Sequence, residues 1–249
     1  NPPNNGENYV IGFANLARNA PFFFLVEDGI VSNGELAGAE VLVTDNAFDG
    51  ATALANAESY LRRNVDYVIE FQTDANFGPV IMKNMNEPGE TMSGRVLSTK
   101  SNFFPGSAAI VHDPSEEWDP KILNRKADLG TKFIQTQFCY DIDILKTYMK
   151  YIVDAGLAEK MSFIIGIGPF RSEKSAQWMK DKLFGTIIPD AMINRMEQAT
   201  DKIEEGILIC AELIDQLKNI DGVSGAHLMA PRNLTAIAPT IKKSGIRIS

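Results

Sequence analysis

The 249-residue chain is poor in cysteine, histidine and tryptophan, with two of each. Cys139 and Cys210 lie far apart and have no metal-ligand spacing, so the sequence predicts two buried free thiols and no metal site. Basic residues are also scarce: 24 Lys and Arg stand against 32 Asp and Glu. The resulting net charge of -8 argues against a nucleic-acid backbone as a partner.

Long apolar runs and a secretion leader are missing as well. No run reaches the roughly twenty apolar residues that a membrane-spanning helix needs, so we expect no membrane span. The first five residues have neither a basic n-region nor an apolar h-region, which predicts a cytoplasmic protein without a signal peptide. The GIGP sequence at 166–169 lacks a third glycine, and Pro169 interrupts the helix start, so it is not a dinucleotide-binding fingerprint.

What is present is an alternation of buried strands and amphipathic helices. The clearest example is 133–156, where a strand with Gln135 and Gln137 interleaved runs into a helix that Asp141 or Asp143 caps. Further strands are expected at 9–16, 40–46, 67–73, 103–114, 162–170 and 225–233, with a weak one at 95–99.

This alternation predicts an α/β fold with a parallel sheet and right-handed crossovers. About eight such units in one chain favour a (βα)8 barrel, a TIM-barrel-like fold, over residues 1–249 as a single domain. An open, doubly wound sheet is the alternative. In both folds a small-molecule ligand meets the carboxyl ends of the strands, so we expect one continuous sheet with its ligand-facing loops on a shared rim.

One family resemblance covers about residue 95 to the C-terminus. The segments that carry it are FIQTQFCYD, IIGIGPF, GTIIPDAMINRMEQA, ICAELIDQL and GVSGAHLMAPRN. In this order and spacing they resemble the last four strands of methylenetetrahydrofolate reductase, a flavin enzyme built on a (βα)8 barrel. The resemblance implies FAD as the cofactor and, for an active member, an NAD(P)H-dependent oxidoreductase acting on folate.

The same resemblance suggests cofactor-binding residues. Gln137 falls where the family places a glutamine facing both flavin and folate, and Lys126 where it meets the flavin phosphates. Asp119 matches a residue near the ribityl chain, and His112 lies at a strand end that contacts flavin in the family. The competing interpretations are a strand-end cap for Gln137 and a solvated helix face for Lys126 and Asp119. The run AAIVHDP around His112 departs from the family pattern.

The family's catalytic carboxylates are not found. The family needs a glutamate on the first strand and an aspartate on the fourth, but YVIGFANL and GRVLST contain neither. Glu70 lies in the middle of the third strand, where we expect it to face a helix layer or pair locally. We therefore assign no catalytic residue. Acid–base catalysis contributes about 10²–10⁴-fold to the rate, so without these carboxylates we expect little or no turnover.

The first part of the chain, about 9–86, resembles something else. IGFANLARNAPFFFLVEDG, VLVTDNAFD and a strand–TDA–helix pattern are similar to the first lobe of a periplasmic sugar-binding protein, which is flavodoxin-like. That resemblance implies that Phe22 and Phe23 stack on a sugar ring and that Thr73, Asp74 and Asn76 bind its hydroxyls. The competing interpretation packs both phenylalanines in the core.

These two resemblances suggest a recombined or engineered chimera, with a sugar-binding-protein-like part at 1–86, a junction at 87–102 and a reductase-like part at 103–249. Three functions then stay open. The first is a chimeric (βα)8-like scaffold with residual flavin, folate or phosphate binding. The second is an active flavin-dependent reductase, and the third is a sugar-binding protein.

Overall fold

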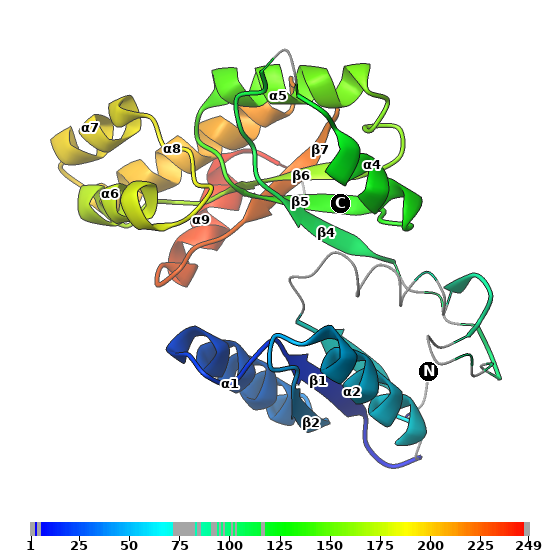
Figure 1. Ribbon diagram of the computed structural model, residues 1–249. Helices are drawn as coiled ribbons and strands as arrows, with labels where there is room; N and C mark the ends of the chain where they lie inside the picture. The colour runs from blue at the N-terminus through cyan, green and yellow to red at the C-terminus, as the bar shows by residue number, and fades with distance from the viewer. Residues whose placement is uncertain are drawn as a thin grey trace. The chain divides into compact units, whose positions relative to one another are not determined.

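A computed structural model describes residues 3, 6–71, 83, 86–90, 94, 96, 98–100, 102, 104–115 and 118–246. The chain divides into two compact units, which we call unit 1 (Asn1–Phe103) and unit 2 (Phe104–Ser249). Both are α/β, and their named strands pair in parallel (Figure 1). Within the described ranges, no helix is both long and apolar enough to cross a membrane.

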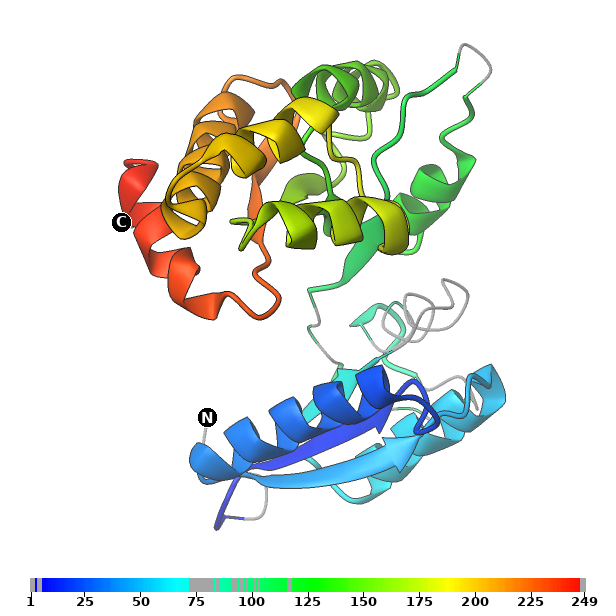
Figure 2. The same cartoon turned by 90° about the vertical axis from the view of Figure 1, so that its left-hand side faces the viewer.

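Unit 1 contains a three-stranded sheet with the order β2-β1-β3. The strands are β1 (Val10–Asn15), β2 (Glu40–Asp45) and β3 (Tyr67–Glu70), and the helices are α1 (Pro21–Leu36) and α2 (Gly50–Arg62). Proline opens α1, where its missing N–H needs no partner. Asp49 caps α2 by accepting a hydrogen bond of 2.7 Å from the Thr52 N–H. Figure 2 shows α1 (blue) lying along β1 and β2.

The two helices of unit 1 cover opposite faces of its sheet. A Cβ on Gly34 of α1 would meet the side chains of Val41 and Ile11, so α1 packs on the face that Ile11 points to. The Tyr60 ring of α2 packs on Gly12, the next residue of β1. Successive strand residues point to opposite faces, so unit 1 is doubly wound.

Helix α1 is longer than the sequence predicts. The segment 31–38 is marked by glycine and asparagine, which favours a helix–strand connection there, yet α1 continues to Leu36. Gly34 is buried there, and a side chain at this position would collide with Val41 Cγ2. The glycine therefore lets α1 approach β2 closely, a packing role that overrides its low helix propensity.

Unit 2 contains a four-stranded sheet with the sequential order β4-β5-β6-β7. Its strands are β4 (Gly106–Ala109), β5 (Phe133–Phe138), β6 (Ser162–Ile167) and β7 (Val223–Leu228). Its helices are α4 (Lys121–Asp128), α5 (Ile142–Asp154), α6 (Glu173–Lys182), α7 (Asp190–Gln198), α8 (Lys202–Leu217), the 3-10 helix η1 (Leu234–Ala236) and α9 (Ile237–Lys243). Of the two candidate caps of α5, Asp141 is the one observed, and it accepts from the N–H groups of Asp143 and Ile144.

One face of the unit 2 sheet carries the core. Ile134, Phe163 and Ile165 are fully buried and belong to one apolar cluster with residues of α5 and α8, which run along the same side of the sheet (Figure 1). Gln135, next to Ile134, is exposed, and Gln137 is only partly buried. A sequential strand order with right-handed crossovers places every connecting helix on one side, which explains the difference between neighbouring residues.

The described strands form two sheets rather than the one continuous sheet that we expected, and a closed barrel is not confirmed. The physical reason lies in β1: it pairs with β2 on one side and β3 on the other, whereas a barrel requires sequential neighbours. Of the weak strand at 95–99, Arg95 and Leu97 lie outside the described residues, and Val96 forms an isolated antiparallel bridge with Glu90. The single-domain organisation stays a prediction.

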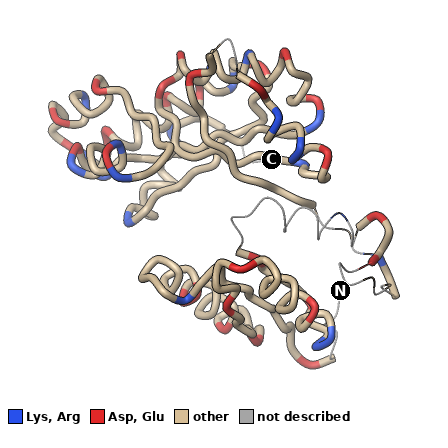
Figure 3. Tube along the Cα trace, in the orientation of Figure 1, with Lys and Arg blue, Asp and Glu red and all other residues tan. Residues whose placement is uncertain are grey.

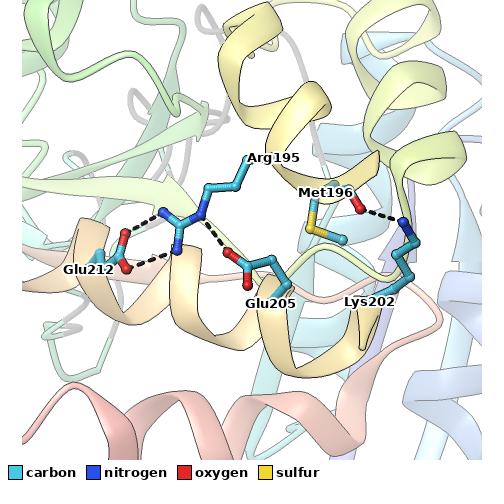
Figure 4. Close-up of polar contacts among 5 residues, drawn as sticks. All are labelled: Arg195, Met196, Lys202, Glu205 and Glu212. Atoms are coloured by element: carbon cyan, nitrogen blue, oxygen red, sulfur yellow. Dashed lines mark hydrogen bonds and ion pairs between the residues drawn. The ribbon is translucent and has the colours of Figure 1, made fainter. Parts of the chain in front are cut away.

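Helices α7 and α8 are joined by an ion-pair cluster (Figure 4). Arg195 donates to both carboxylate oxygens of Glu212, at 2.5 and 2.9 Å, and also to Glu205. Lys202 donates to the carbonyl oxygen of Met196 at 2.7 Å. The mix of acidic and basic residues at 197–218 predicts a solvated helix face, and Glu212 is exposed as expected. Arg195, just before this range, links the two helices.

The net negative charge of the chain lies mainly in unit 1, where acidic residues (red) outnumber basic ones (blue) (Figure 3). Residues 1–103 contain 13 acidic and 6 basic residues, and residues 104–249 contain 19 and 18. Unit 2 is therefore close to neutral, so its overall charge opposes an anionic ligand far less than the net charge of the whole chain suggests.

Candidate functional site

Unit 2 contains a cavity of about 620 Å³ at the carboxyl ends of its strands. This volume lies within the roughly 300–1,000 Å³ that is usual for small-molecule sites. Its lining comes from β4, β5, β7, α4, α5, the loops that follow β4 and β7, and the segment after α6: Ala108, Ala109, Ile110, His112, Trp118, Asp119, Pro120, Ile122, Leu123, Lys126, Gln135, Thr136, Gln137, Tyr148, Phe184, His227 and Met229.

The four residues that the sequence suggests for a cofactor all line this one cavity. His112 follows β4, Asp119 lies just before α4, Lys126 is in the last turn of α4, and Gln137 is near the end of β5. These positions span 26 residues of sequence, and the βα connections bring them together. Their roles towards a cofactor remain predictions.

Lys126 supplies the cavity with a cation from α4. Its Nζ donates a hydrogen bond to the carbonyl oxygen of Ala108 on β4, so the side chain reaches back over the strand end. Burial lowers the pKa of this ammonium group from its usual value. Asp119 is more exposed, and its Oδ1 accepts a hydrogen bond of 2.9 Å from the Lys121 N–H at the start of α4.

Gln137 is fixed in orientation by two hydrogen bonds. Its Nε2 donates to the carbonyl oxygen of Phe184 at 3.2 Å, and its Oε1 accepts from the Phe138 N–H at 3.0 Å. A primary amide has two N–H donors and two acceptor lone pairs. One donor and one lone pair therefore stay available to a ligand, which is compatible with either a ligand contact or the strand-end cap that the sequence leaves open.

Aromatic rings form one wall of the cavity. His112 lies 5.2 Å from Tyr148 and 6.0 Å from Trp118, measured between ring centroids, and Trp118 lies 6.1 Å from Tyr148. Tyr151 lies 5.8 Å from Trp118 and extends the cluster away from the cavity lining. Burial raises the pKa of Tyr148 to about 12, so this phenol is neutral at physiological pH.

His227 on β7 is a lining residue that the sequence did not suggest. Its Nδ1 is buried and has no hydrogen-bond partner in the part of the chain that the structure describes. Burial also lowers the pKa of the imidazole. Tyr148, Trp118 and Phe184 were missed as well, because helical or aromatic spacing alone does not separate a core position from a cavity wall.

Carboxylates are scarce at this cavity, since Asp119 is the only one among its described lining residues. Glu70 lies in unit 1 on β3, where its Oε1 accepts a hydrogen bond of 2.7 Å from Asn46 Nδ2. Glu70 is the last residue of β3 rather than a mid-strand residue, and its partner within unit 1 lies 24 positions earlier in the chain. Burial raises the pKa of Glu70 to about 7. Within the described residues, no cluster of three His, Cys, Asp or Glu side chains could hold a metal ion.

In unit 1 the predicted sugar-stacking residues belong to an aromatic cluster at the start of α1. Phe22 and Phe23 lie 5.9 Å apart, Phe48 lies 5.5 Å from Phe23, and Phe71 lies 6.0 Å from Phe23. Phe22 is 60% exposed, so it is not a core residue as the competing interpretation required, whereas Phe23 is partly buried. Thr73, Asp74 and Asn76 lie outside the described residues.

These features define an α/β protein with a ligand-sized cavity at the carboxyl edge of a parallel sheet. A family model described as methylenetetrahydrofolate reductase matches residues 86–245, and the chain belongs to that family. The matched range includes the whole of unit 2 up to Gly245, with every residue that lines the cavity. No curated protein matches the chain.

Three of the solved structures that the chain resembles are distant from it in sequence. A solute-binding protein of an ABC transporter from Clostridium phytofermentans, solved with β-D-glucose, is 11% identical, with 94% of this chain and 69% of that chain covered and a TM-score of 0.32. The trehalose repressor from Escherichia coli is 15% identical, with 94% of this chain and 85% of that chain covered and a TM-score of 0.30. The periplasmic binding protein of the arabinose ABC transporter from Shewanella sp. ANA-3 is 10% identical, with 94% of this chain and 95% of that chain covered and a TM-score of 0.26. At these TM-scores the similarities establish neither the fold nor the function of this chain.

Proposed function

We propose that this chain is a chimeric, (βα)8-derived scaffold whose unit 2 binds a flavin, with FAD as the cofactor, and turns over little or no substrate. The carrying observation is that His112, Asp119, Lys126 and Gln137 line one cavity. The family match over residues 86–245 makes a flavin the ligand to test first. A bound flavin would supply hydride-transfer chemistry, while the protein binds and orients it.

The lining of the cavity suits the two halves of such a ligand. The rings of Trp118 and Tyr148 offer an apolar wall against which a planar ring system can pack. The remaining donor and acceptor of the Gln137 amide can pair with the edge of that ring. Lys126 provides a point charge for a phosphate group.

Low turnover follows from the missing catalytic carboxylates of the family. Asp119 is the only carboxylate among the described lining residues, and one of its oxygens already accepts from the Lys121 N–H. The phenol of Tyr148 has a pKa of about 12 and is a weak acid. A general acid–base step contributes about 10²–10⁴-fold, so its loss leaves binding without efficient chemistry. The strand order of unit 1, β2-β1-β3, differs from the sequential strand order of a barrel and supports the chimeric origin.

The test is a titration of the purified chain with riboflavin, FMN and FAD, followed by flavin fluorescence. Lys126→Ala should weaken FMN and FAD binding by about tenfold or more, as expected for a lost charge-assisted hydrogen bond, and leave riboflavin binding unchanged. Arg125→Ala is the matched control, because Arg125 is on the same helix and does not line the cavity. Equal binding of FMN by wild type and Lys126→Ala would contradict the phosphate contact.

An NADH–menadione assay decides between the scaffold and an active reductase. We expect turnover below about 1 s⁻¹, the low end of typical enzymes, because Asp119 is the only carboxylate among the described residues that line the cavity, whereas the family uses a glutamate and an aspartate. Turnover within the enzymatic range would favour the active flavin-dependent reductase.

A sugar-binding function for unit 1 is the second candidate. The aromatic cluster of Phe22, Phe23, Phe48 and Phe71 favours it, because exposed aromatic faces suit sugar rings. Ribose or arabinose should then raise the melting temperature of the wild-type chain and have no effect on Phe22→Ala. An unchanged melting temperature in millimolar sugar would exclude this function.

A further inference from the structure

Phe184 is placed at the mouth of the unit 2 cavity with its ring in solvent. It follows α6 and is 85% exposed although it lines the cavity. Ile122 of α4, 69% exposed, and Ile110, 37% exposed, line the same cavity. Exposed large apolar side chains gathered at a concave site indicate that a ligand covers them.

The backbone of Phe184 is held in place from β5. Its carbonyl oxygen accepts the hydrogen bond from Gln137 Nε2 at 3.2 Å. Three residues later, the Ile187 N–H donates to the Phe138 carbonyl at 3.0 Å, and the Ile187 carbonyl accepts from the Tyr140 N–H at 2.8 Å. Residue 187 thus pairs in parallel with the end of β5, and the segment that carries Phe184 is a fixed extension of the sheet edge.

A second support comes from β4. Gly185 has a φ of +75°, and a Cβ there would lie 2.8–2.9 Å from three side-chain atoms of Ile110, the residue that follows β4. The left-handed conformation and the close approach both favour glycine at this position. Gly185 therefore lets the chain turn directly over Ile110, so both neighbouring strand ends position Phe184.

We propose that Phe184 is an aromatic platform that stacks on a planar heteroaromatic ring bound in the unit 2 cavity. The proposal rests on the proposed function of that cavity and adds a ring contact to those of Trp118 and Tyr148. The backbone of Phe184 is preorganised, so stacking requires ordering of one side chain only. Gln137 then has two roles, because its amide positions the platform while its remaining donor and acceptor face the ligand.

A polar ligand without a ring does not account for this arrangement. Ile110, Ile122 and Phe184 expose apolar surface, whereas Lys126 and Asp119 supply the charges of the cavity. A ligand with one planar apolar part and one charged part satisfies both groups of residues. A flat protein partner would cover the rim but would leave the cavity of about 620 Å³ unfilled.

The experiment uses lumichrome and riboflavin, two planar rings without phosphate, titrated into the full chain with fluorescence as the signal. Phe184→Ala should weaken both by about three- to tenfold, the effect expected for one lost ring pair. Phe184→Tyr keeps the ring and should bind within about twofold of wild type. Trp178→Ala is the matched control, because Trp178 is 59% exposed on α6 and does not line the cavity.

The platform proposal is overturned if Phe184→Ala binds lumichrome and riboflavin as tightly as the wild-type chain does. It is also overturned if the wild-type chain binds neither of them. The proposed function fails separately: FMN binding that is no tighter than riboflavin binding and insensitive to Lys126→Ala removes the phosphate contact and leaves the platform intact. If FMN binding depends on Lys126 and not on Phe184, the phosphate contact is supported and the platform proposal fails. Far-ultraviolet circular dichroism of each variant reports whether it is folded.

Discussion

The two sheets of this chain are built from the same βα units but differ in strand order. In unit 1 the order reverses at β1, and helices cover both faces, as Ile11 and Gly12 show. In unit 2 the order is sequential, and helices cover the face of Ile134 while Gln135 stays exposed. The uncovered face and carboxyl edge of unit 2 are where its cavity forms. Strand order, rather than composition, therefore decides which unit has room for a ligand beside its sheet.

The largest expected effect separates the two faces of unit 2. Phe163→Ala removes a fully buried ring from the helix-covered face and should lower the free energy of unfolding by about 3–5 kcal/mol. Gln135→Ala, on the other face, should change it by less than about 0.5 kcal/mol. Urea unfolding followed by tryptophan fluorescence measures both, because Trp118 and Trp178 are in unit 2. Similar losses in the two variants would mean that both faces are covered.

The second effect concerns pH and unit 1. Burial raises the pKa of Glu70 from 4.5 to about 7, so the folded state binds this proton more tightly than the unfolded chain does. The stabilisation is fully present below pH 4.5 and is lost as the pH rises through 7. We expect a loss on the order of 2–3 kcal/mol across this window. His227 in unit 2 acts in the opposite sense, because burial lowers its pKa and stability falls as the pH drops below 6.5.

Hydrogen exchange of the β1 amides between pH 5 and pH 8, corrected for the intrinsic rate, measures this dependence in unit 1 alone. Glu70→Gln keeps the shape of the side chain and removes the titration, so its protection should be independent of pH over the window. An unchanged slope in Glu70→Gln would assign the dependence to another group.

The third effect tests whether helices pack on both faces of the unit 1 sheet. A Cβ at Gly12 would lie 2.6–2.8 Å from three ring atoms of Tyr60, whose hydroxyl donates to the Phe13 carbonyl at 2.7 Å. Gly12→Ala should therefore destabilise unit 1 by about 1–3 kcal/mol, measured by hydrogen exchange. Gly29→Ala in α1 is the control, because no described atom lies within 4 Å of its added Cβ. It should stabilise the helix by up to about 1 kcal/mol.

The smallest effect concerns the ion pairs of unit 2. Arg195→Ala removes the contacts to Glu205 and Glu212 and should lower the free energy of unfolding by about 0.5–1 kcal/mol, since Arg195 is partly exposed. The loss should shrink in about 1 M salt, which screens exposed charges. Lys146→Ala, whose pair with Asp143 spans 4.0 Å on the surface, should have no measurable effect.

The sequence predicted the elements better than their arrangement. The strand at 133–138, its helix and the Asp141 cap were confirmed because apolar spacing and capping chemistry are local. The reversal at β1 does not follow from strand–helix alternation, which is the same in a barrel and in a doubly wound sheet; only the flavodoxin-like resemblance of residues 9–86 and the doubly wound alternative pointed to it. Trp118, Tyr148 and Phe184 were missed for a related reason: only the packing of α4, α5 and the segment after α6 turns them towards one cavity.

The two cysteines give unit 2 a built-in reporter. Cys139 and Cys210 are both fully buried, and burial raises the pKa of each thiol to about 12. The thiolate is the nucleophile that attacks an alkylating reagent, and it is both inaccessible and rare in the folded chain at neutral pH. Unit 1 contains no cysteine. The rate of alkylation therefore measures how often the reductase-like half opens, without any contribution from the half that precedes it.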